Sequence, residues 1–342
     1  MSDSGGAGIL RMNATARSAR MWAKSTTWLA GIFLFGAMVA PAQAQSFPEK
    51  QIRIVVPFGP ASSTDKIARA LADGLQETAK AKVLVDNKPG ANGSIAAQAV
   101  AQAQPDGYTL ILATNSTHAA NLSLFRKLNY DPLKDFEPVT PLATAGLVLA
   151  VPYGSEAKSL GELTKWAKGR SGKVNSGSGS ATSRASARLY AVMAGIDAED
   201  IQYKSLPDAV LELMGGRLDF VFADPGQLVP LAEGRKVRLL AVTTTRRLPV
   251  VPEVETMQAL GFSGFDLSAW FAVFAPAGTP RETVDQLNRM MSVVIQTPRF
   301  KETIRQLGGY EQTGSPQQLR VQQEAEIAKW AGVVKTARIE PQ

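Results

Sequence analysis

Three loops rich in small hydroxyl residues are the parts of this sequence best suited to chemistry. They are 57–65 (PFGPASSTD), 114–118 (TNSTH) and 176–183 (SGSGSATS), and each is predicted to join a strand to a helix. Free N–H groups and the positive dipole end make a helix start attractive to anions. Ligands of open α/β sheets bind at the carboxyl ends of the strands. Together the loops could hold a carboxylate without an arginine; alternatively, they are ordinary caps and turns.

The motifs of common enzyme classes are missing or incomplete. The chain has no cysteine and a single histidine, which excludes a Cys nucleophile, a disulfide scaffold and a zinc finger. Residues 169–174 (GRSGKV) have the wrong spacing for a P-loop, and 177–179 (GSG) lack the third glycine of a dinucleotide fingerprint. We therefore predict no catalytic residues, no cofactor and no metal site.

One catalytic alternative stays open at this stage. His118 could act as the base for Ser63 or Ser178, which would make the chain an exported hydrolase. The ordinary interpretation is that His118 is a polar residue at a helix start. Asp224 ends a predicted strand, so it lies either at the cleft or in contact with solvent.

Residues 1–44 have the three parts of a signal peptide. Arg11, Arg17, Arg20 and Lys24 precede an apolar stretch of 13 residues, 28–40 (WLAGIFLFGAMVA), and an A-x-A box at 42–44. That stretch is shorter than the roughly 20 residues that span a bilayer. We predict cleavage after Ala44 and a periplasmic location; the alternative is an uncleaved anchor. Without these four cations and Asp3, the net charge of +7 falls to +4, with no basic cluster that would favour nucleic acid.

The elements that must position the three loops alternate between strand and helix. This order predicts a mainly parallel α/β sheet. Helix starts are expected at Ser63 or Thr64, at Asn115 or Ser116, at Thr279 with Pro280 as the first helical residue, and at Ser315 with Gln318 in a capping box. The predicted strands are 51–58, 83–85, 108–114, 147–151, 174–176, 201–204, 218–224, 237–243 and 265–275.

Several stretches together resemble one protein family. They are 57–60 (PFGP) with Asp65 and Arg69, 87–91 (NKPGA), 105–110 (PDGYTL) and 269–280 (AWFAVFAPAGTP). The chain resembles the Bug (TctC) family, the extracytoplasmic substrate-binding receptors of tripartite tricarboxylate transporters. The resemblance runs from about Phe47 to the C-terminus.

This resemblance implies a type 2 periplasmic-binding-protein fold, with two α/β domains around a ligand cleft. With the absence of a linker, it predicts a discontinuous domain I of 46–145 plus 270–342 and a domain II of 146–269. The implied protein is a monomer that binds a small organic carboxylate and serves membrane transporter subunits or a sensor. The implied ligand contacts are Phe58, Ala61, Ser62, Ser63, Thr64, Asp65, Thr114, Asn115, Thr117, Ser178, Gly179, Thr182, Ser183, Arg184 and Asp224.

Three departures from the family affect the expected site. At 203–206, YKSL replaces a more common Tyr-Lys-Gly run. Ala61 and Ser62 stand where the family usually has two glycines, and Arg184 stands where it often has histidine. Arg184 could pair with a second ligand carboxylate or point to solvent, and solvent is the preferred interpretation. The sharpest expectation is that backbone N–H groups of residues 62–65 hold the carboxylate.

Overall fold

Short strands of buried aliphatic residues alternate with helices along residues 47–342, the part of the chain that the computed structural model describes. The strands form two sheets. The first, in spatial order, consists of β11 (Gly309–Glu311), β4 (Phe136–Gly146), β10 (Ser268–Pro276), β3 (Thr109–Thr114), β1 (Ile52–Val56) and β2 (Val83–Asn87). The second consists of β7 (Ala198–Gln202), β6 (Val174–Ser178), β8 (Phe220–Ala223), β5 (Val148–Pro152) and β9 (Val237–Val242).

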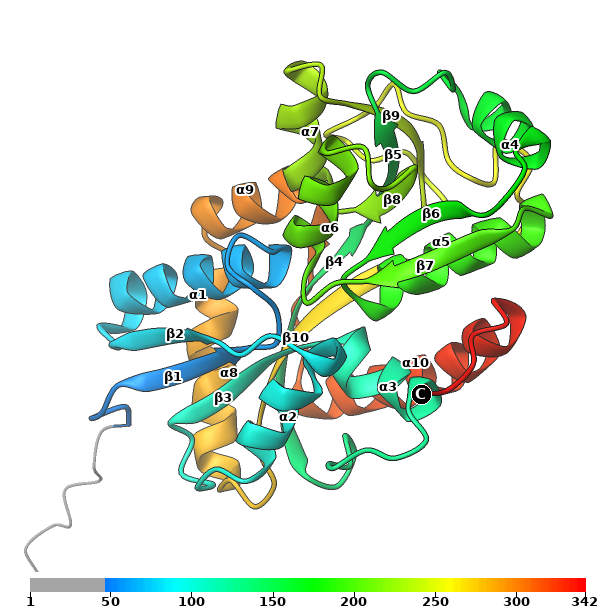
Figure 1. Ribbon diagram of the computed structural model, residues 1–342. Helices are drawn as coiled ribbons and strands as arrows, with labels where there is room; N and C mark the ends of the chain where they lie inside the picture. The colour runs from blue at the N-terminus through cyan, green and yellow to red at the C-terminus, as the bar shows by residue number, and fades with distance from the viewer. Residues whose placement is uncertain (1–46) are drawn as a thin grey trace, which may run out of the picture. The chain divides into compact units, whose positions relative to one another are not determined.

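Helices pack on both faces of each sheet and bury three hydrophobic clusters. Figure 1 shows the green middle part of the chain forming the second sheet and its helices. The helices near the first sheet are α1 (Ser63–Ala79), η1 (Ala91–Gly93), α2 (Ser94–Ala101), η2 (Ser116–Ala120), α3 (Asn121–Leu124), α8 (Arg281–Ile295), α9 (Pro298–Gln306) and α10 (Pro316–Thr336). Those of the middle part are α4 (Leu160–Gly169), α5 (Ala181–Ala194), α6 (Leu206–Met214) and α7 (Pro225–Glu233).

The prediction of mainly parallel sheets is wrong, because both sheets are mixed. β1 runs parallel to β2 and β3, but β10 is antiparallel to β3 and β4. In the second sheet β6 is parallel to β7 and β8, whereas β5 is antiparallel to β8 and β9. The antiparallel pairs involve β4, β5 and β10, the strands at which the chain passes from one sheet to the other.

β4 is a strand that the sequence pattern did not predict. It contains Pro138 and Pro141, which cannot donate a ladder hydrogen bond and therefore argue against a strand. The β4–β10 pairing accommodates them with two register shifts, at the steps that bring Ala272 opposite Pro141 and Phe274 opposite Pro138. Proline in a sheet is tolerated at such irregular positions.

The two sheets are joined at one point by a single residue, Leu147, which lies between β4 and β5. The chain returns through 243–267. The Leu147 amide donates to Thr243 Oγ1 (2.9 Å), the Thr243 amide donates to the Leu147 carbonyl (3.0 Å), and the Leu267 amide donates to the Thr243 carbonyl (3.1 Å). The first sheet thus comes from 52–146 and 268–311, and the second from 148–242. That these two halves act as the two predicted domains stays a prediction.

Two expected helix starts have different outcomes. The Ser315 capping box is confirmed, with Gln318 N–H donating to Ser315 Oγ (3.2 Å) and Ser315 N–H donating to Gln318 Oε1 (2.8 Å). The Thr279 cap is wrong: its hydroxyl donates to the Pro276 carbonyl (2.7 Å), and Pro280 occupies the cap position before α8.

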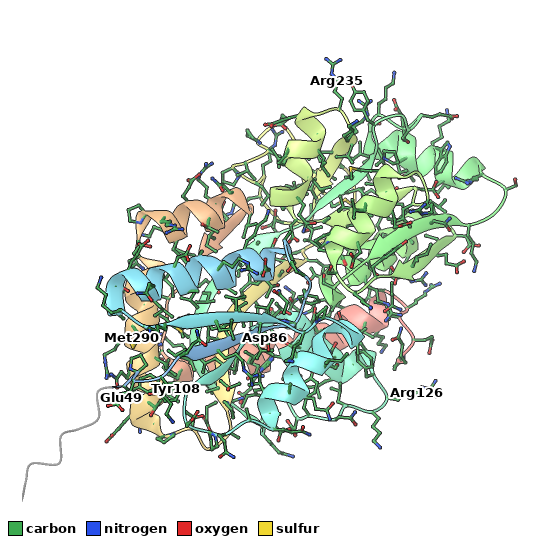
Figure 2. The ribbon with its side chains drawn as sticks, turned by 60° about the vertical axis from the view of Figure 1, so that its left-hand side comes forward. Glu49, Asp86, Tyr108, Arg126, Arg235 and Met290 are labelled. Atoms are coloured by element: carbon green, nitrogen blue, oxygen red, sulfur yellow. The ribbon has the colours of Figure 1, made fainter. Side chains whose placement is uncertain are left out.

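The described chain begins against Tyr108, which directly precedes β3 of the first sheet. The Phe47 and Tyr108 rings are 5.0 Å apart, and the Glu49 amide donates to Tyr108 Oη (2.9 Å). Figure 2 shows Glu49 and Tyr108 together at this end of the molecule. The predicted signal peptide and its cleavage point lie outside the described residues. No helix within 47–342 has the length and apolar character to cross a membrane.

Candidate functional site

The three hydroxyl-rich loops meet around one small cavity of about 30 Å³. Nine of the fifteen candidate residues line it. They are Phe58, Ser62, Ser63, Thr64, Thr114, Asn115, Gly179, Thr182 and Asp224. The cavity lies where β1, β3 and β6 lead into helices, as the sequence predicts.

The first loop leaves two backbone amides on the cavity wall. Ser62 is the N-cap of α1, where Ser63 or Thr64 was expected, and its Oγ accepts the Asp65 amide (3.2 Å). The Ser62 amide itself donates to the Gly59 carbonyl (3.3 Å). The amides of Ser63 and Thr64, the first two positions of α1, donate to no group within residues 47–342. Of the four amides expected to hold a carboxylate, these two are available.

Asp65 and Ala61 shape the first loop but do not line the cavity. The Asp65 carboxylate accepts the Ala61 amide (3.0 Å), Arg69 Nε (3.1 Å) and Asn87 Nδ2 (3.0 Å). Burial alone would raise the pKa of Asp65, but these hydrogen bonds outweigh burial and lower it. Ala61 is exposed, with a φ of 64°, in the left-handed region that favours glycine.

The second loop connects the first sheet with the start of α5. The expected helix start is confirmed, since Asn115 occupies the cap position before η2, a π-helical turn, but its side chain makes no capping hydrogen bond. Instead, Asn115 Nδ2 donates to Thr182 Oγ1 (2.6 Å), and Ser116 Oγ accepts the Ala181 amide (3.0 Å). These two side chains therefore bind the N-terminus of α5 across the cavity.

Thr117 and His118 point away from the cavity. Thr117 Oγ1 donates to the Thr114 carbonyl and accepts the Thr114 amide (3.2 Å each). His118 is fully buried between Phe136 and Phe274, with ring centroids 4.5 and 4.2 Å from its own. Desolvation lowers the pKa of His118 to about 3, so the imidazole is neutral. His118 does not line the cavity, and nothing here supports the hydrolase alternative.

The third loop caps α5 through Ser180 and Ser183. Ser180 Oγ accepts the Ser183 amide (3.3 Å), and Ser183 Oγ accepts the amides of Gly179 and Ser180 (3.1 Å each). Ser183 is therefore part of the cap and does not line the cavity. Gly179 passes so close to Ser205 that an added Cβ would lie 2.2 Å from the Ser205 carbonyl carbon. Only glycine fits at this position.

Arg184 does not point to solvent, so that interpretation is wrong. Its side chain is 16% exposed, and its Nε lies 3.2 Å from the Oδ2 of Asp200, whose side chain is 7% exposed. Desolvation lowers the pKa of Arg184 and raises that of Asp200. Arg184 and Ser178 line a neighbouring small cavity, which shares Gly179 and Ser180 with the first.

Asp224 lies at the cavity, which is the first of the two positions, cleft or solvent, that were expected for it. It follows β8 directly, occupies the cap position before α7 and is 4% exposed, which excludes the solvent contact. Its carboxylate accepts Gln227 Nε2 (2.8 Å). Burial raises the pKa of Asp224 to about 6, although Ser63 and Lys66 beside it act in the opposite direction.

Six residues of the cavity wall were not among the candidates expected from the sequence. Ser116 and Ser180 lie inside the loops that were singled out, and their residue type was the available signal. The others are apolar and come from the crossing strands or from the start of α6, so that only long-range pairing reveals them. The six are Ser116, Leu147, Ser180, Leu206, Ala269 and Phe271.

Charge is scarce in this cavity. Asp224 is the one ionisable side chain among the lining residues. Within 47–342, no group of three or more His, Asp or Glu side chains is placed to hold a metal ion. The wall therefore offers backbone amides, hydroxyls, one amide side chain and apolar surface.

Sequence comparison identifies relatives over most of the chain. A family described as "Tripartite tricarboxylate transporter family receptor" matches residues 67–339. The protein BugT of Bordetella pertussis (strain Tohama I) is 36% identical over 313 residues, which are 89% of this chain and 95% of BugT.

Solved structures agree with this relationship. Rpa4515 of R. palustris, solved with adipate, is 34% identical and superposes with a TM-score of 0.83 over 86% of this chain and all of that one. The periplasmic binding protein BugD is 29% identical, with a TM-score of 0.83 over 86% of this chain and all of BugD. The predicted periplasmic-binding fold is thereby confirmed. The chain belongs to the Bug (TctC) family of tripartite tricarboxylate transporter receptors, a family of solute-binding proteins.

Proposed function

We propose that this receptor works in the periplasm, where it binds a small organic carboxylate and passes it to transporter subunits in the membrane or to a sensor. The observation that carries the proposal is the pair of Ser63 and Thr64 amides, which have no acceptor within residues 47–342 and lie at the first turn of a 17-residue helix on a cavity wall. Buried backbone donors need an acceptor. An anion is the acceptor that the helix dipole also favours.

The binding free energy that these two amides can supply is consistent with a micromolar affinity for a carboxylate. A hydrogen bond to a charged acceptor contributes about 1.5–3 kcal/mol. Two of them account for roughly half of the about 8 kcal/mol that a micromolar dissociation constant requires. The carbon skeleton of the ligand would lie on the apolar wall of Phe58, Leu147 and Phe271, where burial contributes about 25 cal/mol per Å².

The bound relative suggests which acids to test first. Because Rpa4515 holds adipate, dicarboxylic acids with a flexible carbon chain are the first candidates for this receptor. We propose that the receptor is a monomer and that its two predicted domains, divided near 145/146 and 269/270, close around the ligand. Leu147 and Thr243, where the strands cross, would act as the hinge.

Export through an N-terminal signal peptide completes the proposal. It rests on the cationic, apolar and A-x-A segments of residues 1–44 and on the periplasmic relative BugD. Mass spectrometry of the protein from a periplasmic extract should find Gln45 at or near the N-terminus. A protein that retains Trp28 would contradict cleavage.

A ligand screen tests the proposed function directly. Thermal unfolding of the purified mature chain would be measured with mono-, di- and aromatic carboxylates, including adipate and malate, and with 1,6-hexanediol as the uncharged counterpart of adipate. A ligand present at 100 times its dissociation constant stabilises the folded state by about 2.7 kcal/mol. We expect at least one acid, and not the diol, to stabilise the protein. Stabilisation by none of the acids would refute the proposal.

A further inference from the structure

Asp224 places a second carboxyl group in the cavity where the ligand's carboxylate is proposed to bind. It lines the same wall as Ser63 and Thr64, whose amides are the proposed anion donors. Ser63 and Asp224 are 3% and 4% exposed, so both are buried at this wall of the cavity. A ligand carboxylate on the Ser63 amide would therefore lie close to this acid.

The groups around Asp224 do not supply enough positive charge for two carboxylates. From α1 it faces Ser63 and Lys66, and from its own helix it faces Gln227. The residues that line the cavity from β3, β10, α5 and α6 carry no titratable side chain. Lys66 is half-buried, and its Nζ donates to the Gly226 carbonyl (3.2 Å). Its attraction is smaller than the cost of burying the Asp224 charge, so the pKa of Asp224 stays above its usual value.

Two carboxylates close together in one buried site, with only the half-buried Lys66 to balance them, do not both stay ionised, so they share a proton. Since the proposed ligand is an acid, we infer that this receptor binds its carboxylate together with one proton, which is held on Asp224. A protonated carboxyl group also has an O–H donor. Asp224 then becomes a third donor beside the Ser63 and Thr64 amides instead of a repelling charge. This inference rests on the proposed function.

Proton uptake makes the affinity depend on pH in a defined way. Above pH 6 the free receptor loses the Asp224 proton, and binding must restore it. By linkage, the dissociation constant then rises towards tenfold for each pH unit. With a free-protein pKa of about 6 for Asp224, the dissociation constant should rise about 75-fold between pH 6.5 and 8.5. Below pH 6 the dependence should level off.

The experiment is titration calorimetry of the full mature chain with adipate, or with the most stabilising acid of the screen if adipate does not bind. Measurements at pH 6.5, 7.5 and 8.5, each in two buffers of different ionisation enthalpy, give the number of protons taken up. The variants are Asp224→Asn, which resembles the protonated form, and Asp73→Asn, which removes an exposed charge outside the cavity. Circular dichroism checks that each variant is folded.

We expect the wild type and Asp73→Asn to take up close to one proton at pH 8.5 and to lose affinity as the pH rises. Asp224→Asn should take up none and should bind at pH 8.5 about as tightly as at pH 6.5. Acid binding by the wild type without proton uptake, or unchanged uptake in Asp224→Asn, would overturn the inference and leave the proposed function intact. If none of the acids binds, the proposed function itself fails, and this inference with it.

Discussion

Ser63→Pro is the substitution that isolates one backbone donor of the cavity. Ser63 is the first residue of α1, the helical position that proline tolerates best, and its amide makes no bond that the helix needs. Ser62 has φ −64° and ψ 159°, the extended conformation that a residue before proline requires. The substitution should therefore remove the amide without disturbing the helix.

The expected loss follows from the charge of the acceptor. A hydrogen bond to a carboxylate contributes about 1.5–3 kcal/mol, so that its loss weakens binding by about 12- to 160-fold. Loss of the hydroxyl in Ser63→Ala keeps the amide and should cost less. The comparison between Pro and Ala at this one position separates the backbone contribution from that of the side chain.

Calorimetric titration with adipate, or with the acid selected by the screen, measures both variants at pH 6.5. Thermal unfolding without ligand should place Ser63→Pro within about 1 kcal/mol of the wild type. A dissociation constant within threefold of the wild type, in a variant that is folded and equally stable, would refute the assignment of the carboxylate to this turn.

Three further predictions concern the loops and the buried acid. Ala61→Gly should raise the free energy of unfolding, measured in urea, by about 0.5–1 kcal/mol. The left-handed conformation costs alanine about 1–2 kcal/mol, and the greater flexibility of glycine in the unfolded chain offsets part of that gain. A destabilised variant would contradict the φ of 64° at Ala61. Gly179→Ala should abolish ligand-induced stabilisation, since its Cβ would lie 2.2 Å from the Ser205 backbone. Gly161→Ala, which has nothing within 4 Å of the added Cβ, should leave ligand-induced stabilisation unchanged. Asp224 should make the free protein less stable as the pH rises from 4 to 7, because burial raises its pKa from 3.8 to about 6 and the folded state therefore binds the proton more tightly than the unfolded state; at about 1.4 kcal/mol for each pKa unit the difference approaches 3 kcal/mol. Urea unfolding between pH 4 and 8 would measure that fall, and an equal fall in Asp224→Asn would show that other groups cause it.

The loops could be located from the sequence because clusters of Ser, Thr and Gly follow aliphatic strands. Their internal geometry could not be predicted to the residue. Ser62, Ser63 and Thr64 are all good caps, and only the backbone conformation of the turn selects Ser62. For the same reason Ser183 was assigned to the ligand although it belongs to the cap. Residue type does not show on which side of a turn a hydroxyl lies.

Features that depend on long-range pairing were out of reach of the sequence pattern. Phe271 reaches the cavity because β10 pairs in a fixed register with β4. β4 itself was hidden by its two prolines. The partner of Arg184 was unpredictable in the same way, since Asp200 approaches it from the neighbouring strand β7. Such contacts arise from the fold and leave no local signal.

The single residue between β4 and β5 links the registers of the two sheets. Because Leu147 is the only residue between the two strands, a shift of β4 by one residue along β10 must also shift β5 between β8 and β9. Such a slip would exchange the side chains that each strand presents to the two buried faces of its sheet. One hydrophobic cluster also extends through both halves, from Phe136 to Phe222. Folding errors in one half would therefore propagate to the other, and the two halves should unfold in one cooperative transition.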